Sequence, residues 1–600
     1  MMPNPTCSID IFDTLLTRSV ARPSDVFILV AERARSECKD YTEFLSIFPV
    51  VRMRSEIKCR RKCSSKETTI DLIYEEVRLS NDLPLDVVSK LKQLELDIEL
   101  ENCILLHENV TNLKKRGVKF DGAVLLTDMY LPRETIVAML AKCDLFFAEE
   151  RIIISHEINA SKANGGAYKV LKKRFGSITC HYGDNLHADV KMAKKHGLEA
   201  HQIVSKNNQI TSKIKANIKT RSFGEVVVQK CIREVILLSN NRLELSENQI
   251  LAVKNFAPVL LLCAFKILQV LRETKTAKIA FASRDGYYVY RVFTILCSYL
   301  KVEEIDCNYI FLSRSSLRSL TEYIEHRDQE SSRDTGIVDL KAELESLNLG
   351  EVLSESFIFD IGWNGTVQKA FQEFKVRGAI PGDWFKSGIY LHVSNIFPEK
   401  KLSHFSLSKI FGDFKFQLCL ESERVPPEWF LRAPHGGVVG YISEDHRKRP
   451  RLAPQRKQER REIKAIGDAY ITFAKAFIEE VSRNGAVLGL VISSVQKPVL
   501  QNYFNFIFFP SVDEAQAFSA SDHNCDASHV NFSQVVGRTN LMEIFCSRNT
   551  RIAKKTGWPS ASLALMFSGE ILRIAQFVYL LRCIFIYHVK KALKYFRSLA

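Results

Sequence analysis

Three polar residues in the first third of the chain could together transfer a phosphoryl group. Asp10 follows the short apolar strand expected at residues 7–9, and Thr127 follows the apolar run AVLL. Lys162 lies in the glycine-containing segment ASKANGGAY, before an expected helix. Because strands of an α/β sheet present their carboxyl ends to a ligand crevice, Asp10 could act there as a nucleophile. The Thr127 hydroxyl and the Lys162 ammonium group would then contact phosphate oxygens.

Two further carboxylates indicate a metal. Asp184 and Asp189 lie in HYGDNLHADV and offer hard oxygen ligands suited to Mg²⁺. A magnesium ion would offset the charge between the phosphate and Asp10. A single Asp in such a place is usually a turn residue, but the ordered set favours the catalytic interpretation.

The segments SIDIFDTLL (8–16), LLTDMYLP (125–132), ASKANGGAY (160–168) and HYGDNLHADV (181–190) resemble the four motifs of the haloacid dehalogenase (HAD) superfamily. The resemblance implies a Rossmann-like domain in which Asp10, Asp13, Thr127 and Lys162 are catalytic. It also implies that Asp10, Phe12, Asp184 and Asp189 are the metal-binding positions, with Mg²⁺ as the cofactor.

The resemblance has one departure. Phosphatases of this superfamily usually carry a general acid two residues after the nucleophile, and Phe12 stands there. Asp13 or a cap residue could be the acid. Dehalogenase-type members also lack that acid, so a substrate without phosphate remains an alternative.

The elements around these motifs predict an α/β HAD-like domain at 1–205, with a helical cap inserted at about 19–115. The starts of two helices are expected near Ser24 and Thr69, where a side chain can cap free amide groups. The basic run from Arg52 to Lys62 could line the cleft mouth or form a solvated helix face. The lysine-rich stretch that follows predicts a linker at 206–240.

The second half contains three expected strands that each end in polar or glycine residues. They lead into the segments ASRDGYYVYR, FLSRSS and FDIGWNGT. Glycines let backbone amides approach an anion at a helix N-terminus, and Asp360 can accept hydrogen bonds from sugar hydroxyls.

The third segment resembles the phosphoribosyl-diphosphate (PRPP) loop of type I phosphoribosyltransferases, and SRDG resembles their pyrophosphate loop. A single Asp stands where that loop usually has two acidic residues, and a Trp is unusual inside it. The resemblance implies PRPP-binding residues Ser283, Arg284, Asp285, Gly286, Arg314, Asp360, Gly362, Trp363, Asn364, Gly365 and Thr366. The base that activates the acceptor stays open among Asp285, Glu421 and Glu423.

The order of the two halves resembles a bacterial family of two-domain enzymes for surface polysaccharides. Their phosphoribosyltransferase places 5-phosphoribose on a glycan, and their HAD phosphatase then removes the 5-phosphate to leave ribofuranose. We therefore expect a phosphoribosyltransferase-like α/β domain at 241–440 and a mainly helical region at 441–600. The alternative is a sugar-phosphate phosphatase with a non-catalytic second half that binds a phosphosugar or a partner protein.

Composition limits the partners. The formal net charge of +15 indicates anionic binding partners. The chain shows no zinc finger, RNP-like or helix-turn-helix signature, so nucleic acid is not expected among them. Fifteen cysteines and an N-terminus without an apolar leader favour the reducing cytoplasm. The last segment is apolar but interrupted by charges. It could pack in the core or dock on an anionic membrane, where a lipid-linked glycan acceptor would lie.

Overall fold

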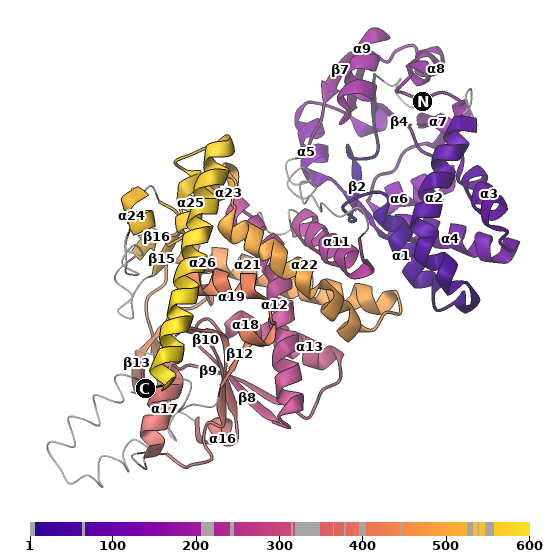
Figure 1. Cartoon of the computed structure of the whole chain (residues 1–600). Helices are drawn as coiled ribbons and strands as arrows, with labels where there is room; N and C mark the ends of the chain where they lie inside the picture. The colour runs from indigo at the N-terminus through magenta and orange to yellow at the C-terminus, as the bar shows by residue number, and fades with distance from the viewer. Residues whose placement is uncertain are drawn as a thin grey trace. The chain divides into compact units, whose positions relative to one another are not determined.

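The computed structural model divides the chain into two compact α/β units (Figure 1). Unit 1 comprises Met1–Glu244 with Glu479–Ser494, and unit 2 comprises Leu245–Ile478 with Val495–Ala600. Parallel sheets in both units confirm the predicted fold class. The structure describes residues 6–62, 67–205, 221–239, 245–313, 316–317, 349–363, 365–376, 378, 380–394, 404–444, 447–524, 532–537, 539, 541–546 and 557–599.

A five-stranded parallel sheet lies at the centre of unit 1, in the order β5-β4-β1-β6-β7. Its strands are β1 (Cys7–Ile9), β4 (Ala123–Thr127), β5 (Ile152–Ile154), β6 (Cys180–Gly183) and β7 (Glu199–Gln202). Ile9 of β1 is in register with Leu125 on one side and with Tyr182 on the other. The chain therefore moves from β1 to both sides, which makes the carboxyl end of β1 a topological switch point, where such sheets bind ligands.

Short helices connect these strands, and apolar side chains of two of them pack on the sheet. Ala167, Tyr168 and Leu171 of one helix and Ala193 of another form one core cluster with Val124 and Leu126 of the sheet. The connecting helices are α5 (His107–Lys115), α6 (Arg133–Lys142), α7 (Ser155–Ile158), α8 (Gly166–Arg174) and α9 (Met192–Lys195), with the short 3-10 helices η2 (Phe120–Gly122) and η3 (Glu149–Arg151) and the π-helix η4 (Leu186–Lys191).

A helical insertion follows the first strand, as the sequence predicts. It lies between β2 (Leu16–Arg18) and β3 (Cys103–Leu105), an antiparallel pair that joins it to the sheet domain. It comprises α1 (Asp25–Ala34), η1 (Lys39–Tyr41), α2 (Thr42–Lys62), α3 (Ile70–Asn81) and α4 (Leu85–Glu101). Because β3 ends the insertion, α5 lies outside the cap whose end was expected at about residue 115.

Arg52 does not line a cleft. Its side chain is fully buried, and its guanidinium group makes two hydrogen bonds, of 2.7 and 2.8 Å, to the buried carboxylate of Glu95. It also stacks on Phe27, with 4.6 Å from Cζ to the ring centroid. A buried charge is stable only when it is paired in this way, so Arg52 holds the cap together.

Part of the expected linker is a buried helix. Residues Phe223–Ser239 form α11, which packs on α1 and buries Val226, Val227, Ile232 and Ile236. The prediction of a linker is wrong for these residues. The lysine-rich stretch ends directly before the helix, and the linker predicted at 206–240 extends over the apolar pattern of the helix. The preceding residues 206–220 lie outside the described part of the chain.

Unit 2 has its own five-stranded parallel sheet, in the order β12-β11-β10-β8-β9. The strands are β8 (Lys278–Ala282), β9 (Asp306–Ile310), β10 (Phe357–Trp363), β11 (Ser387–Val393) and β12 (His404–Ser406). The chain runs from β8 to β9 on one side and returns to β10 on the other. The carboxyl ends of β8 and β10 are thus a second topological switch point.

Helices surround this sheet and form most of the C-terminal region. They are α12 (Glu247–Glu273), α13 (Tyr287–Tyr299), α16 (Leu349–Leu353), α17 (Thr366–Val376), α18 (Leu407–Ile410), α19 (Phe414–Ser422), α20 (Val425–Phe430), α21 (Lys457–Arg483), α22 (Leu488–Phe508), α23 (Val512–Ala517), α24 (Leu541–Cys546), α25 (Pro559–Ala564) and α26 (Gly569–Leu599). Two hairpins interrupt them, β13 (Val438–Glu444) with β14 (Arg447–Leu452) and β15 (Asp522–Asn524) with β16 (Phe532–Gln534). Among the described helices, α12 alone is long and apolar enough for a membrane span, and 83% of its apolar window is buried within the protein.

Candidate active site

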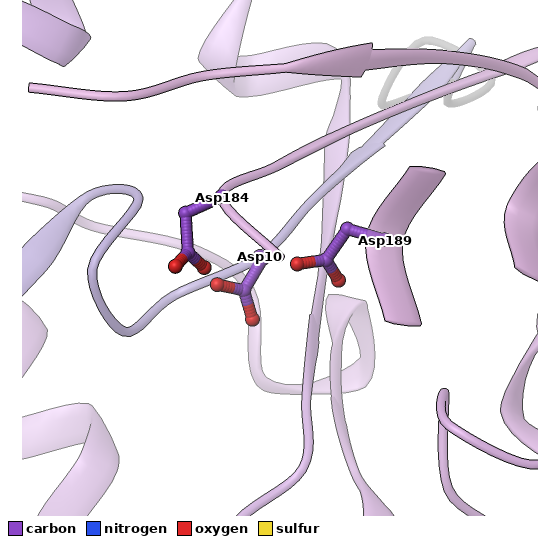
Figure 2. A group of neighbouring side chains, drawn as sticks. All are labelled: Asp10, Asp184 and Asp189. Atoms are coloured by element: carbon purple, nitrogen blue, oxygen red, sulfur yellow. The ribbon is translucent and has the colours of Figure 1, made fainter. Parts of the chain in front are cut away.

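Three carboxylates meet at the switch point of unit 1. Asp10 follows β1, Asp184 follows β6, and Asp189 lies in η4. One carboxylate oxygen of each lies within 4.8 Å of the others, and Figure 2 shows the three groups converging. Asp10 and Asp189 are buried, and Asp184 is partly exposed. Three hard oxygen donors at this spacing could hold a divalent cation such as Mg²⁺.

Lys162 joins two of these carboxylates. Its ammonium nitrogen lies 2.7 Å from Oδ1 of Asp189 and also pairs with Oδ1 of Asp10. Its backbone amide donates to both carboxylate oxygens of Asp128, at 2.9 and 3.0 Å, which fixes the loop before α8. Burial opposes the charge of Lys162, but Asp10 and Asp189 outweigh it and raise its pKa, so the ammonium group stays charged.

Neighbouring polar groups orient Asp10 and Asp189. The Thr14 hydroxyl donates to Oδ2 of Asp10 at 2.9 Å. His181 lies with Nε2 3.2 Å from Oδ1 of Asp189 and with Nδ1 2.8 Å from the Ser8 hydroxyl. These contacts, like those of second-shell groups at metal sites generally, fix where each carboxylate points.

The electrostatics of the three carboxylates favour a bound cation. Burial, opposed by the charge of Lys162, raises the pKa of Asp10 to about 7. Burial and the nearby charges of Asp13 and Asp189 raise the pKa of Asp184 to about 6. Burial would also raise the pKa of Asp189, but the His181 hydrogen bond and Lys162 lower it to about 2. A divalent cation would relieve this repulsion and keep all three groups ionised.

The other residues predicted for this site lie at the same edge of the sheet. Thr127 is buried at the last position of β4, next to Asp128. Asp13 is exposed, adopts a positive φ of 59°, and accepts a hydrogen bond of 2.7 Å from Thr17. The Phe12 ring lies 5.0 Å from the Arg18 guanidinium carbon. Because a phenyl ring offers no metal ligand, only the main-chain carbonyl of Phe12 could contact a metal.

A cavity of about 360 Å³ opens beside the site. Asp13 and Asp184 line it together with two basic residues, Arg18 and Arg233. Its other lining residues are Thr17, Val20, Ala21, Pro23, Gln202, Val204 and Ser205. The cavity therefore combines the edge of the carboxylate cluster with cations that could bind an anionic substrate.

Sequence reasoning missed several of these residues. Arg233 belongs to α11, within the segment expected to be a linker, and its side chain is almost completely buried. Thr14 and His181 belong to the quoted motifs, but their contacts depend on the tertiary structure. The basic residues in an amphipathic pattern after residue 222 were the only signal that could have indicated Arg233.

The described residues among those predicted to bind PRPP lie at the switch point of unit 2. Ser283, Arg284 and Gly286 follow β8, and Asp360, Gly362 and Trp363 lie in β10, the neighbouring strand. Gly286 and Gly362 have no room for a side chain, because a Cβ would lie 2.5 Å from the Ala282 carbonyl oxygen and 2.3 Å from that of His392. Gly365 and Thr366 lie at the start of α17, whereas Arg314 and Asn364 lie outside the described residues.

Local contacts hold these side chains in place. Nε of Arg284 lies 3.1 Å from Oδ1 of Asp285. Burial lowers the pKa of Arg284, but Asp285 and Glu428 outweigh it and raise the pKa overall. The indole nitrogen of Trp363 donates to Glu428 at 2.6 Å.

The two glutamates considered as acceptor bases are buried among internal partners. Glu421 contacts His392 at 3.0 Å and Lys590 at 2.7 Å, and these groups overcome the effect of burial and lower its pKa below the usual range. Glu423 accepts a hydrogen bond of 3.0 Å from Ser560, and burial raises its pKa to about 8. Both glutamates are thus held by internal partners, as structural residues are.

Comparison with known proteins adds little. No family model matches the chain, and no curated protein matches it. A solved structure titled "Crystal Structure analysis of a Dehalogenase" matches with 13% identity, over 33% of this chain and 84% of that chain, at a TM-score of 0.21. At this TM-score the match shows neither a shared fold nor a shared activity.

Proposed function

We propose that unit 1 is a magnesium-dependent phosphomonoesterase of the HAD type. The observation that carries this proposal is the convergence of Asp10, Asp184 and Asp189 with Lys162 at the carboxyl end of β1. An oriented carboxylate next to a buried cation and a metal-binding cluster is the arrangement that nucleophilic attack on a phosphate ester needs.

The residues have distinct roles in this mechanism. A carboxylate oxygen of Asp10 forms a bond to phosphorus while the bond from phosphorus to the leaving alcohol oxygen breaks. Asp13, which lines the cavity, donates a proton to that oxygen and later accepts one from the water that hydrolyses the aspartyl phosphate. Lys162 holds the phosphate and Asp10 together, and Mg²⁺, when bound, offsets the negative charge between them.

The direct test is turnover of p-nitrophenyl phosphate with Mg²⁺. Asp10→Asn should abolish turnover without unfolding the protein, because it keeps the shape of the side chain but removes the nucleophile. Asp121→Asn is the matched control, since Asp121 is exposed before β4. Turnover that persists in Asp10→Asn would mean that Asp10 is not the nucleophile.

A second activity is favoured by the loops at the switch point of unit 2. We propose that these loops bind PRPP and Mg²⁺ and that unit 2 transfers 5-phosphoribose to a glycan. The bond from ribose C1 to the diphosphate breaks, a bond from C1 to an acceptor hydroxyl oxygen forms, and the hydroxyl proton passes to a base. Unit 1 would then remove the 5-phosphate, which accounts for both units on one chain in polysaccharide synthesis.

Binding of PRPP separates this proposal from a non-catalytic second half. Calorimetry with Mg²⁺ should detect PRPP binding to wild type, weakened in Arg284→Ala and Asp360→Ala. Arg291→Ala, on the exposed side of α13, should bind PRPP like wild type. Unaltered binding in both loop variants would refute the transferase assignment. It would leave the proposal for unit 1 standing, because the phosphatase site consists of other residues.

A further inference from the structure

Among the residues that the structure describes, helix α26 contacts the rest of unit 2 along one face. This long helix ends near the C-terminus, drawn in yellow in Figure 1. Gln576 donates to the Pro510 carbonyl oxygen at 2.8 Å, and Tyr587 donates to Gln417 at 2.9 Å. Lys590 pairs with Glu421 at 2.7 Å. Leu572, Tyr579, Leu580 and Cys583 are buried on the same face.

The opposite face is apolar and exposed. We define the apolar stripe as Ile571, Ile574, Phe577, Val578, Leu581, Phe585, Val589, Leu593 and Tyr595. Most of these residues recur every three or four positions, so they lie on one side of the helix. Ile574 is 64% exposed and Phe585 is 70% exposed. Soluble proteins rarely expose a continuous apolar surface of this kind unless it meets a partner.

The charge along the apolar stripe is mainly basic, and the one acidic residue of α26 is Glu570 in its first turn. Residues 571–600 contain no Asp or Glu and six basic residues, Arg573, Arg582, Lys590, Lys591, Lys594 and Arg597. Arg573 and Lys591 are exposed and eighteen residues apart, which is five helical turns at 3.6 residues per turn. Both therefore lie along the same edge of the stripe, where their side chains can reach anions in the plane of a surface.

This combination selects one kind of occupant. A second copy of the helix would bring an equally basic face against the first, so like charges would repel wherever the two stripes met. An anionic bilayer surface satisfies both features, because its acyl boundary accepts the apolar side chains and its phosphates accept the basic ones. The contacts of the opposite face with unit 2 keep the helix parallel to such a surface rather than across it.

We propose that the apolar stripe of α26 docks the protein on an anionic membrane surface. This proposal is independent of either activity, since it rests on residues outside both sites. The helix lies at the interface with Phe577, Leu581 and Phe585 toward the acyl chains, and Arg573 and Lys591 contact lipid phosphates. Attachment in this way is reversible and depends on salt.

Sedimentation of the full-length protein with vesicles tests the proposal. Wild type should bind vesicles of phosphatidylcholine with phosphatidylglycerol at low salt and should not bind phosphatidylcholine alone. Replacing Ile574, Leu581 and Phe585 by Gln should abolish binding. Arg573→Ala with Lys591→Ala should weaken it about 25-fold, since each basic residue near an anionic surface contributes about 5-fold.

A matched control separates the stripe from general hydrophobicity. Phe146, Val376 and Leu490 are 78%, 82% and 70% exposed outside α26, and their replacement by Gln should leave binding unchanged. Binding by the stripe variant at the wild-type level, or failure of wild type to bind anionic vesicles, would overturn the proposal. So would a wild-type dimer in light scattering that the stripe variant converts to a monomer, since the occupant would then be a second copy.

Discussion

The ammonium nitrogen of Lys162 lies 2.7 Å from Oδ1 of Asp189, a carboxylate that His181 and the backbone amide of Asn185 also hold. The same nitrogen pairs with Asp10. One buried cation thus links the proposed nucleophile, Asp10, to a carboxylate of the candidate metal site. Any change at Lys162 should therefore affect both the chemistry and the stability of the site.

Lys162→Met should reduce kcat/KM for p-nitrophenyl phosphate by about 100-fold or more, because a preorganised charge that stabilises the transition state is lost. It should also lower the free energy of unfolding by about 3–5 kcal/mol, since a buried ion pair loses one partner. Steady-state kinetics and urea unfolding measure the two effects. Activity close to wild type would show that Lys162 only packs beside Asp10.

Asp184→Asn should weaken the response to magnesium. A ligand that binds only the folded state raises its unfolding temperature, so Mg²⁺ should stabilise wild type. The variant, with one charged ligand fewer, should need more Mg²⁺ both for this stabilisation and for half-maximal activity. Thermal unfolding across a magnesium titration provides the measurement, with Asp121→Asn as the control. Identical titrations for wild type and Asp184→Asn would place the cation elsewhere.

Arg233→Met should act on substrate binding more than on the chemical step. Arg233 lines the cavity from α11 and is far from Asp10 in the sequence. Its guanidinium group donates to the Arg18 carbonyl oxygen at 3.0 Å. The KM of a sugar phosphate should therefore rise more than its kcat falls. Kinetics with this substrate test the split, and a loss confined to kcat would contradict a role in binding.

Glu423 should make unit 2 less stable as the pH rises. Burial raises its pKa in the folded state from 4.5 to about 8, so the folded state keeps a proton that the unfolded state has lost. The stabilisation from Glu423 is fully present below about pH 4.5 and is lost as the pH rises to about 8, by up to about 1.4 kcal/mol per pH unit. Glu423→Gln removes this dependence. Urea midpoints of wild type and variant across that range should converge at low pH and diverge at high pH, whereas parallel curves would refute the shift.

The parts of the fold that short local patterns encode could be predicted from the sequence. The strands before Asp10 and Thr127 are apolar segments that end in polar residues, and the helices of the insertion have clear starts. The structure places Asp10, Lys162, Asp184 and Asp189 together, because parallel strands bring their carboxyl ends to one edge.

What the sequence did not reveal depends on distant contacts. Arg52 looked like part of a basic surface, but its charge is buried against Glu95, forty-three residues away. Arg233 lines the cavity from α11, a helix that lies within the segment predicted as a polar linker. Residue type alone makes Glu421 and Glu423 candidate bases, whereas their partners His392 and Ser560 depend on packing.

The most direct test of the central claim uses wild-type protein under single-turnover conditions in water enriched in oxygen-18, with a phosphate ester as substrate. Rapid acid quenching followed by mass spectrometry should find a phosphoryl group on the peptide that contains Asp10. The label should enter the released phosphate and not the Asp10 carboxylate. An unmodified peptide, or label in the carboxylate of Asp10, would contradict the account, and the latter would mean that water attacks the carboxyl carbon of the Asp10 intermediate rather than its phosphorus.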